Sequence, residues 1–426
     1  MLSARFVIFV YLEEMRRLAV LLALGLLSAC SSSEDGSGSG GSAGTSGAGG
    51  AAGSAGSGGI SGAAGASGSG GSAGSDAGTP RPYRLGLTTF PYDTTQAAVD
   101  YVYAKVAEDA DLFTVHTTEG VPWVEALEQK PVEQMGSSIV AKWTKMKAAV
   151  TPSQKLYLAL TPLDDGRAKL ADYWGSAEHM PLPGSWATAS FDSADVKSAY
   201  LQTCRAAIDF FHPDYLAIGI EVNLLRKNNP AAWSAYVDLH KATYTALKAE
   251  NPALPIFVTM TGVDLLDGWT DADHGEQMAA LADVLPYSDY LGISFYPFMS
   301  KYLTDPYPAS TWSDLASLAG GKPLVIGESG YPAQAFSIPS YSLSFDGTEA
   351  KQNAFVSDML AAAESQPMPF VVNFLVRDYD ALWATLPPGP VQDNGSVWRD
   401  TGLYDENGSE RSALATWKSA LARAAK

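Results

Sequence analysis

The stretch that decides the fold is residues 216–225, with the sequence LAIGIEVNLL. It is a nearly continuous aliphatic run, which is typical of a parallel β-strand covered on both faces. A single carboxylate, Glu221, stands between Ile220 and Val222, and the first basic residue after it is Arg226. Ionising a carboxylate among apolar neighbours costs free energy unless it is paired or its pKa rises. The stretch therefore predicts a buried strand that ends in an unusual acid.

Seven more apolar runs lie along the chain, and each of the eight is followed by a helical pattern. Eight such units predict an α/β fold, the (β/α)₈ TIM barrel. A doubly wound open sheet is the alternative, but it would usually show a Gly-rich phosphate turn after an early strand, and the sequence has none. The expected strands are 83–90, 112–116, 156–160, 215–222, 255–261, 290–296, 323–329 and 370–376, and the expected helices are 95–108, 132–150, 193–211, 231–250, 274–285, 313–318, 349–364 and 409–424.

Three segments are expected, and the barrel is the last, at 81–426. Residues 1–30 have a charged start, an apolar run and a small-residue end, which is typical of a secretory signal. The end, Leu-Ser-Ala-Cys at 27–30, resembles the bacterial lipobox, which implies a lipid on Cys30. Residues 31–80 are almost wholly Gly, Ser and Ala, so we expect a disordered linker. Together these features predict a lipid-anchored protein of the bacterial cell envelope, facing the surface or the periplasm.

Charge and composition limit the classes of partner that we expect this protein to bind. The net charge is −18, of which residues 1–80 contribute −2, so the expected barrel carries −16. This acidity argues against a nucleic-acid partner. Cys204 is the only cysteine besides Cys30, so no disulfide framework is available. No zinc pattern is present, and we expect no metal, no cofactor and a monomer.

Catalytic groups of a barrel come from the carboxyl ends of its strands, so the polar residues that close each run are the candidates. Two glutamates, Glu221 and Glu328, end the fourth and seventh runs, 107 positions apart. The expected substrate-binding residues are Tyr296, His116, Asn223, Arg377, Asp378 and Trp383. A structural role remains open for several of these. His116 could be a histidine at a strand end whose hydrogen bonds are all made within the protein, and Arg377 could pair with Asp378.

A facing pair of carboxylates is what glycoside hydrolysis requires. One acid must be protonated, which an apolar setting favours, and the other must be ionised to attack the anomeric carbon. We expect Glu221, between Ile220 and Val222, to be the acid/base and Glu328 the nucleophile. A retaining mechanism predicts about 5–5.5 Å between the two carboxyl groups.

This arrangement resembles clan A of the glycoside hydrolases, whose members are retaining (β/α)₈ enzymes with glutamates ending strands four and seven. The sequences GISFYPF at 292–298 and ESGYP at 328–332 are similar to motifs of the endo-β-1,4-galactanases, and TGLYDENG at 401–408 resembles the turn before their last helix. The resemblance implies that Tyr296 hydrogen-bonds the nucleophile and that the substrate is a β-linked polysaccharide or oligosaccharide, with galactan favoured.

One residue departs from the clan. Its members usually carry Asn directly before the acid/base glutamate, where this chain has Ile220. Asn223 or another residue could make the missing contact, the substrate could differ, or catalysis could be lost. The alternative function is therefore a non-catalytic glycan-binding lipoprotein on the same barrel. A chitinase-like barrel is set aside because its Asp-x-x-Asp-x-Asp-x-Glu pattern is absent.

Overall fold

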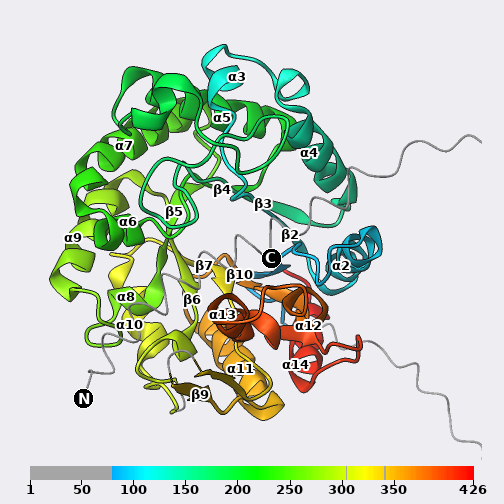
Figure 1. The fold of residues 1–426 in the computed structure, drawn as a ribbon. Helices are drawn as coiled ribbons and strands as arrows, with labels where there is room; N and C mark the ends of the chain where they lie inside the picture. Colours follow the sequence, from blue (N-terminus) through cyan, green and yellow to red (C-terminus); the bar gives the residue numbers. More distant parts are fainter. Residues whose placement is uncertain (1–78, 304, 340–341) are drawn as a thin grey trace, which may run out of the picture.

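The eight expected strands form one closed parallel barrel in the computed structural model, which describes residues 79–303, 305–339 and 342–426. The order around the barrel is β1-β10-β7-β6-β5-β4-β3-β2 (Figure 1), so the TIM-barrel prediction is confirmed. The strands are β1 (Arg84–Leu87), β2 (Leu112–His116), β3 (Lys155–Ala159), β4 (Tyr215–Ala217), β5 (Ile256–Thr261), β6 (Leu291–Phe295), β7 (Leu324–Ser329) and β10 (Phe370–Asn373). The expected signal and nearly all of the linker lie outside the described residues.

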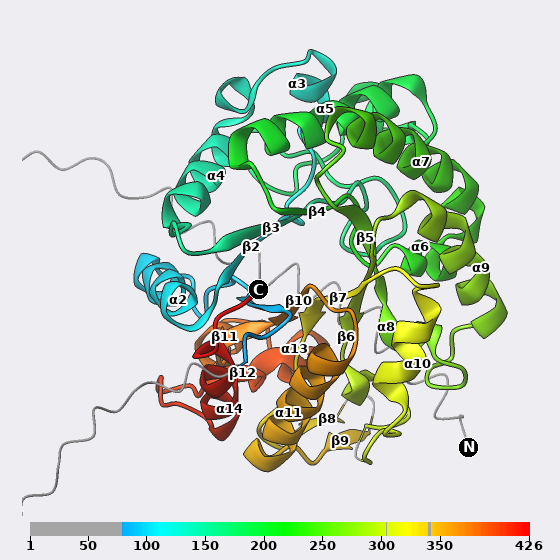
Figure 2. The same cartoon turned by 180° about the vertical axis from the view of Figure 1, so that it is seen from behind.

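Helices surround the strands as an outer ring, which Figures 1 and 2 show from opposite sides. Each expected helix has a counterpart. These are α2 (Gln96–Asp109), α4 (Ser137–Ala149), α5 (Ala194–Phe211), α7 (Trp233–Glu250), α9 (His274–Val284), α10 (Thr311–Leu318), α11 (Glu349–Ser365) and α14 (Ser412–Leu421). Several begin at a residue whose side chain accepts a backbone N–H of the first turn, such as Thr95, Ser193 and Thr348.

Two apolar layers account for the continuous hydrophobic runs. Side chains of a strand alternate between faces, and one set packs under the helices in the main core. The other set forms a smaller cluster inside the barrel. Tyr157, Phe257 and Phe370 fill its centre, with the Tyr157 and Phe370 rings 4.8 Å apart. Ile220 belongs to this inner cluster and is buried.

The fourth strand is shorter than expected. β4 ends at Ala217, although residues 218–222 still hydrogen-bond β5: the Ile218 amide donates to the Phe257 carbonyl and the Val222 amide to the Thr259 carbonyl. Within this segment Glu221 adopts a left-handed backbone conformation with φ of 52°. Non-glycine residues rarely occupy this region, and where they do the surrounding structure holds them there.

The eighth run is divided between two sheets. Only β10 joins the barrel, and β11 (Leu375–Arg377) pairs with β12 (Gly402–Tyr404) outside it. A hairpin of β8 (Phe336–Ile338) and β9 (Leu343–Phe345) follows β7. Several short α-helices were not expected from the sequence: α3 (Trp123–Leu127), α6 (Asn223–Asn228), α8 (Gly262–Leu265), α12 (Asp380–Trp383) and α13 (Pro390–Arg399).

The described chain starts and ends at the amino end of the barrel strands. Arg81, just before β1, forms a β-bridge with Ala425. The Arg81 amide donates to the Ala424 carbonyl at 2.9 Å, and the Lys426 amide donates to the Arg81 carbonyl at 3.0 Å. The carboxyl ends of the strands, where a barrel's site is expected, therefore lie on the opposite side. Within the described ranges, no helix combines the length and apolar character needed to span a membrane.

Candidate active site

Glu328 is placed by an irregularity in β7. The pairing of β6 with β7 runs from Ile293–Ile326 directly to Ser294–Glu328, so Gly327 is an extra residue in the ladder. Such a bulge re-aims the side chain that follows it. A Cβ on Gly327 would lie 3.0 Å from both the Tyr157 hydroxyl and a Thr259 methyl group, so a side chain there would crowd the barrel interior.

The Glu328 carboxyl group lies among polar partners in a buried setting. Its Oε1 accepts a hydrogen bond from the Tyr296 hydroxyl, and its Oε2 is 3.7 Å from Nε2 of His116. Burial and the negative charge of Glu221 raise the pKa of Glu328 to about 8, whereas the Tyr296 hydroxyl and Arg167 act in the opposite direction. The Glu328 carboxyl group therefore holds a proton at neutral pH more readily than an ordinary glutamate does.

Tyr296 and His116 both lie beside Glu328. The resemblance implied the hydrogen bond from Tyr296, whereas His116 was expected only as a substrate-binding residue. Tyr296 is held by Trp398, whose ring centroid is 4.7 Å away. Burial and the nearby Arg167 lower the pKa of His116 to about 4, so this imidazole is neutral at neutral pH. Among the described residues, Nδ1 of His116 has no hydrogen-bond partner. His116 can therefore offer a neutral ring to a bound molecule.

Glu221 differs from the expectation in its surroundings. Ile220 points into the barrel and Val222 into the main core, but the Glu221 side chain is 18% exposed, with Oε2 3.6 Å from Nη2 of Arg167. Its backbone N–H donates to Oγ1 of Thr259 at 2.9 Å. The expected apolar enclosure of this carboxyl group is wrong, because neighbours in sequence point away from it.

Arg167 is the group that sequence reasoning missed. It follows β3 in the stretch LDDGRAK at 163–169, whose charges look like an ordinary solvated loop. The structure buries it: 7% of the side chain is exposed, and its charge acts on Glu221, Glu328 and His116. Nothing in the sequence separates this arginine from a surface one, because its burial depends on how the loop folds over the barrel.

Asn223 is not a substrate ligand. It is fully buried at the start of α6, where its Nδ2 donates to the Gln277 side chain at 2.7 Å and its Oδ1 accepts the Thr261 amide at 2.8 Å. These bonds tie α6 to β5 and α9. The prediction that Asn223 contacts a sugar is corrected, because its polar atoms are already bound within the protein.

Arg377 and Asp378 also have structural roles, although they do not pair with each other as considered above. Asp378 is buried, forms an ion pair with Arg411, and accepts the Gly402 amide at 2.8 Å. The Arg377 guanidinium lies 3.9 Å from the centroid of Tyr92. Both predicted substrate contacts are corrected: β11 leaves the barrel, and these side chains then fasten the segment before α14.

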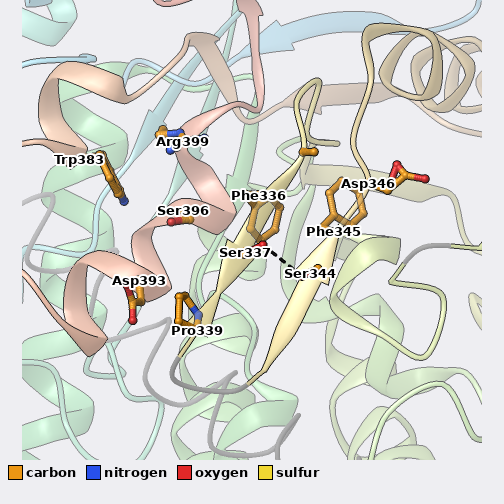
Figure 3. A pocket seen from close by; sticks show the side chains of 11 residues that line it. Phe336, Ser337, Pro339, Ser344, Phe345, Asp346, Trp383, Asp393, Ser396 and Arg399 are labelled. Atoms are coloured by element: carbon orange, nitrogen blue, oxygen red, sulfur yellow. Dashed lines mark hydrogen bonds between the residues drawn. The ribbon is translucent and has the colours of Figure 1, made fainter.

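Trp383 lines a separate cavity. Its ring lies at the end of α12, and its Nε1 donates to the Gln392 carbonyl at 2.7 Å. The cavity, of about 630 Å³, lies between α12–α13 and the β8–β9 hairpin, with Phe336 on the hairpin side (Figure 3). Neither Glu221 nor Glu328 lines it. The expected tryptophan thus borders a groove on the rim and not the space between the two glutamates.

Three carboxylates after the eighth barrel strand could supply metal ligands. Oxygens of Asp378, Asp380 and Asp400 lie within 4.8 Å of one another. Arg411 pairs with Asp378, and Arg399 pairs with Asp400 at 2.8 Å. The two guanidinium groups already supply the positive charge that this cluster needs.

Two carboxyl groups, at the ends of β4 and β7, thus lie near enough for the charge of one to act on the other. One is beside an arginine, and the other is beside a tyrosine hydroxyl and a neutral histidine. Proton donation by one carboxyl group and nucleophilic attack by the other is chemistry that two nearby carboxyl groups can perform. Of the eight residues expected at the site, the structure brings Glu221, Glu328, Tyr296 and His116 together.

No family model matches the chain, and no curated protein matches it. Solved structures do. A GH5_18 protein from Streptomyces cattleya, in complex with GlcNAc, has a TM-score of 0.55 at 14% identity, over 82% of this chain and 83% of that one. A GH5_18 protein from Bifidobacterium longum, in complex with Manβ1-4GlcNAc, has a TM-score of 0.54 at 16% identity, over 80% and 78%. A GH53 catalytic domain from Ignisphaera aggregans gives 0.44 at 17% identity, over 72% and 84%. The two GH5_18 matches show that the chain shares their barrel fold.

Proposed function

We propose that this protein is a retaining β-glycoside hydrolase, with Glu221 as acid/base and Glu328 as nucleophile. The observation that carries the proposal is the carboxyl pair at the ends of β4 and β7, where burial and then the charge of Glu221 raise the pKa of Glu328. The Tyr296 hydroxyl, which donates to Glu328, orients one oxygen and leaves the other for attack. The shared barrel with structures that hold GlcNAc and Manβ1-4GlcNAc adds support.

The reaction proceeds in two displacements. In the first, the Glu328 carboxylate bonds to the anomeric carbon while the glycosidic C–O bond breaks, and Glu221 gives its proton to the departing oxygen. In the second, Glu221 takes a proton from water, the resulting hydroxide attacks the anomeric carbon, and the ester bond to Glu328 breaks. Both carboxyl groups return to their starting states.

The single proton of the pair must lie on Glu221 for the first step. In the free protein the raised pKa of Glu328 favours a proton on Glu328 itself. Positive charge that develops on the anomeric carbon next to Glu328 reverses this preference, because it stabilises the adjacent carboxylate. The reactive arrangement is thus reached as the transition state forms.

The substrate is a β-linked polysaccharide or oligosaccharide. The motifs at 292–298 and 328–332 favour a β-1,4-galactan. The ligands of the similar structures make β-mannosides the second class to test. The groove beside Trp383 has an aromatic wall of the kind that packs against the CH face of a sugar, so it suits a longer chain.

The experiment is a panel of β-galactan, β-mannan and defined β-linked oligosaccharides, with measurement of released reducing ends and of product stereochemistry. Release with retained configuration by the parent, and none by Glu328→Gln, supports the proposal. Inverted products, or equal release by the variant, contradict it. Binding of a glycan without release would favour the non-catalytic glycan-binding protein instead.

We also propose that a lipid on Cys30 holds the barrel at the bacterial cell envelope through the 31–80 segment. The described chain enters at the amino end of β1, so the tether would join the barrel on the face opposite Glu221 and Glu328. Mass spectrometry of the mature N-terminal peptide from a bacterial host tests this. A diacylglyceryl cysteine is expected, and an unmodified Cys30 or a different first residue would refute it.

A further inference from the structure

Arg167 is held by a turn that is fastened on both sides. Within the turn, the Arg167 amide donates to the Asp164 carbonyl at 2.9 Å, and Oδ1 of Asp164 accepts the amides of Ala168 and Lys169 at 2.7 and 3.0 Å. Arg167 itself has a φ of 50°, which a residue with a side chain rarely adopts. The turn therefore has a definite shape that local hydrogen bonds maintain.

The second fastening comes from α6, the helix that follows Glu221. Asn228 and Asn229, at and beyond its end, donate their side-chain amides to the carbonyls of Gly166 and Ala168, both at 2.8 Å. The segment that carries Glu221 and the turn that carries Arg167 are thus joined directly. A strained residue held in this way is typical of a functional site.

The guanidinium has one edge bound and one edge directed at the site. Nη1 donates to the Asp164 carbonyl at 3.0 Å, and Nε has no partner among the described residues. Nη2 is 3.6 Å from Oε2 of Glu221, an ion pair that is longer than a hydrogen bond. A small movement would convert this contact into a charge-assisted hydrogen bond, which is stronger when Glu221 is ionised.

We propose that Arg167 is the positioning residue of the acid/base: it stabilises the Glu221 carboxylate as the proton leaves for the glycosidic oxygen. The inference rests on the proposed function. In the first displacement Glu221 changes from neutral acid to anion, and the nearby cation lowers the free energy of that product and of the transition state before it. Among the described residues, Arg167 is a cation whose ion pair with this carboxylate the structure shows.

Leaving-group chemistry separates this role from sugar binding. A 2,4-dinitrophenolate leaves without protonation, whereas a phenolate with a high pKa needs the acid. The probes are 2,4-dinitrophenyl and phenyl β-D-glycosides of mannose and galactose, and the measured quantity is kcat/KM, which reports the first displacement. We expect Arg167→Met to lower kcat/KM on the phenyl glycoside about 10- to 100-fold and on the dinitrophenyl glycoside less than about 3-fold.

Two further variants keep the test decisive. Arg167→Lys retains the charge and should recover part of the loss on the phenyl glycoside, which also covers the case in which the methionine variant folds poorly. Arg226→Met, on α6 but paired with Glu276 away from the glutamates, is the matched control and should leave both rates unchanged. Equal losses on the two leaving groups, or no loss on either, would overturn the inference.

A Glu221→Ala variant distinguishes a failure of the role proposed for Arg167 from a failure of the proposed function. If it lowers kcat/KM on the phenyl glycoside far more than on the dinitrophenyl glycoside while Arg167→Met does not, only the role of Arg167 is wrong. If Glu221→Ala affects both leaving groups equally, or the parent cleaves none of the four glycosides, the proposed function fails.

Discussion

The ends of β4 and β7 each present one glutamate, but they do so by different means. Glu221 stands on a left-handed residue beyond a shortened strand, partly exposed and beside Arg167. Glu328 follows a bulge within a full strand, where a tyrosine hydroxyl donates to it and burial raises its pKa. The same residue type thus stands in two settings, one beside a cation and one where burial raises its pKa. The difference teaches that strand position alone does not assign a chemical role.

The largest expected effect comes from removing the carboxyl group of Glu328, at the end of β7. Glu328→Gln should lower kcat by about 10⁴-fold or more on any substrate that the parent cleaves, because the amide cannot form the covalent intermediate. Steady-state hydrolysis with the folded variant checks this. Glu276→Gln, on the exposed side of α9, is the control and should retain activity. A Glu328→Gln variant within tenfold of the parent would mean that the β7 glutamate is structural.

Asp378 provides a contrasting buried acid outside the pair. Asp378→Asn should destabilise the fold by about 3–5 kcal/mol, because the buried Arg411 loses its buried ion-pair partner and keeps only the exposed Glu349. Its kcat should stay within about threefold of the parent's at a temperature where both are folded. Urea unfolding measures the loss of stability, and steady-state hydrolysis measures kcat. A large loss of kcat with unchanged stability would return Asp378 to the list of substrate-binding residues.

The Tyr296 hydroxyl, which donates to Glu328, is one of the features that distinguish the surroundings of the two glutamates. Tyr296→Phe removes the hydroxyl that donates to Glu328, so kcat should fall about 10- to 100-fold. The pKa of Glu328 should rise further, since this hydroxyl acts to lower it. A pH–rate profile measures both. Tyr307→Phe, which loses a hydroxyl contact to Asp358 on the surface, should change neither quantity.

The smallest effect concerns stability and pH. The pKa of Glu328 is about 8 in the folded protein and about 4.5 when unfolded, so the native state binds more protons between these values and loses stability as pH rises through them. Glu328→Gln removes this loss. We therefore compare the unfolding free energy of the Glu328→Gln variant with that of the parent at each pH. The difference, variant minus parent, should be about 1–3 kcal/mol more positive at pH 8 than at pH 5. Urea unfolding at both pH values tests this, with the exposed Glu133→Gln as control, and a pH-independent difference would refute it.

Much of the fold follows from the sequence because its pattern is strong. Eight buried parallel strands leave eight apolar runs, and carboxyl-end geometry then groups Glu221, Glu328, Tyr296 and His116. The rest depends on where the chain departs from that pattern. β4 ends early and turns Glu221 away from its apolar neighbours, and a helix begins at Asn223 and buries it.

The eighth run shows the same limit. FVVNFLV reads as one strand, yet it is divided between the barrel and the β11–β12 pair, which takes Arg377 and Asp378 away from the glutamates. Arg167 could not be anticipated either, because its place depends on bonds from Asn228 and Asn229, about 60 residues further along the chain. Local composition predicts an exposed arginine there, and tertiary contacts decide otherwise.

The most direct test of the central claim is labelling with a 2-deoxy-2-fluoro β-glycoside that carries a dinitrophenyl leaving group, in the sugar series that the parent cleaves. Such a reagent slows the second displacement and leaves the sugar on the nucleophile. Peptide mass spectrometry of the inactivated protein should place one fluoroglycosyl group on Glu328 and none on Glu221. A label on Glu221, or continued hydrolysis without any covalent adduct, would contradict the assignment of Glu328 as the nucleophile.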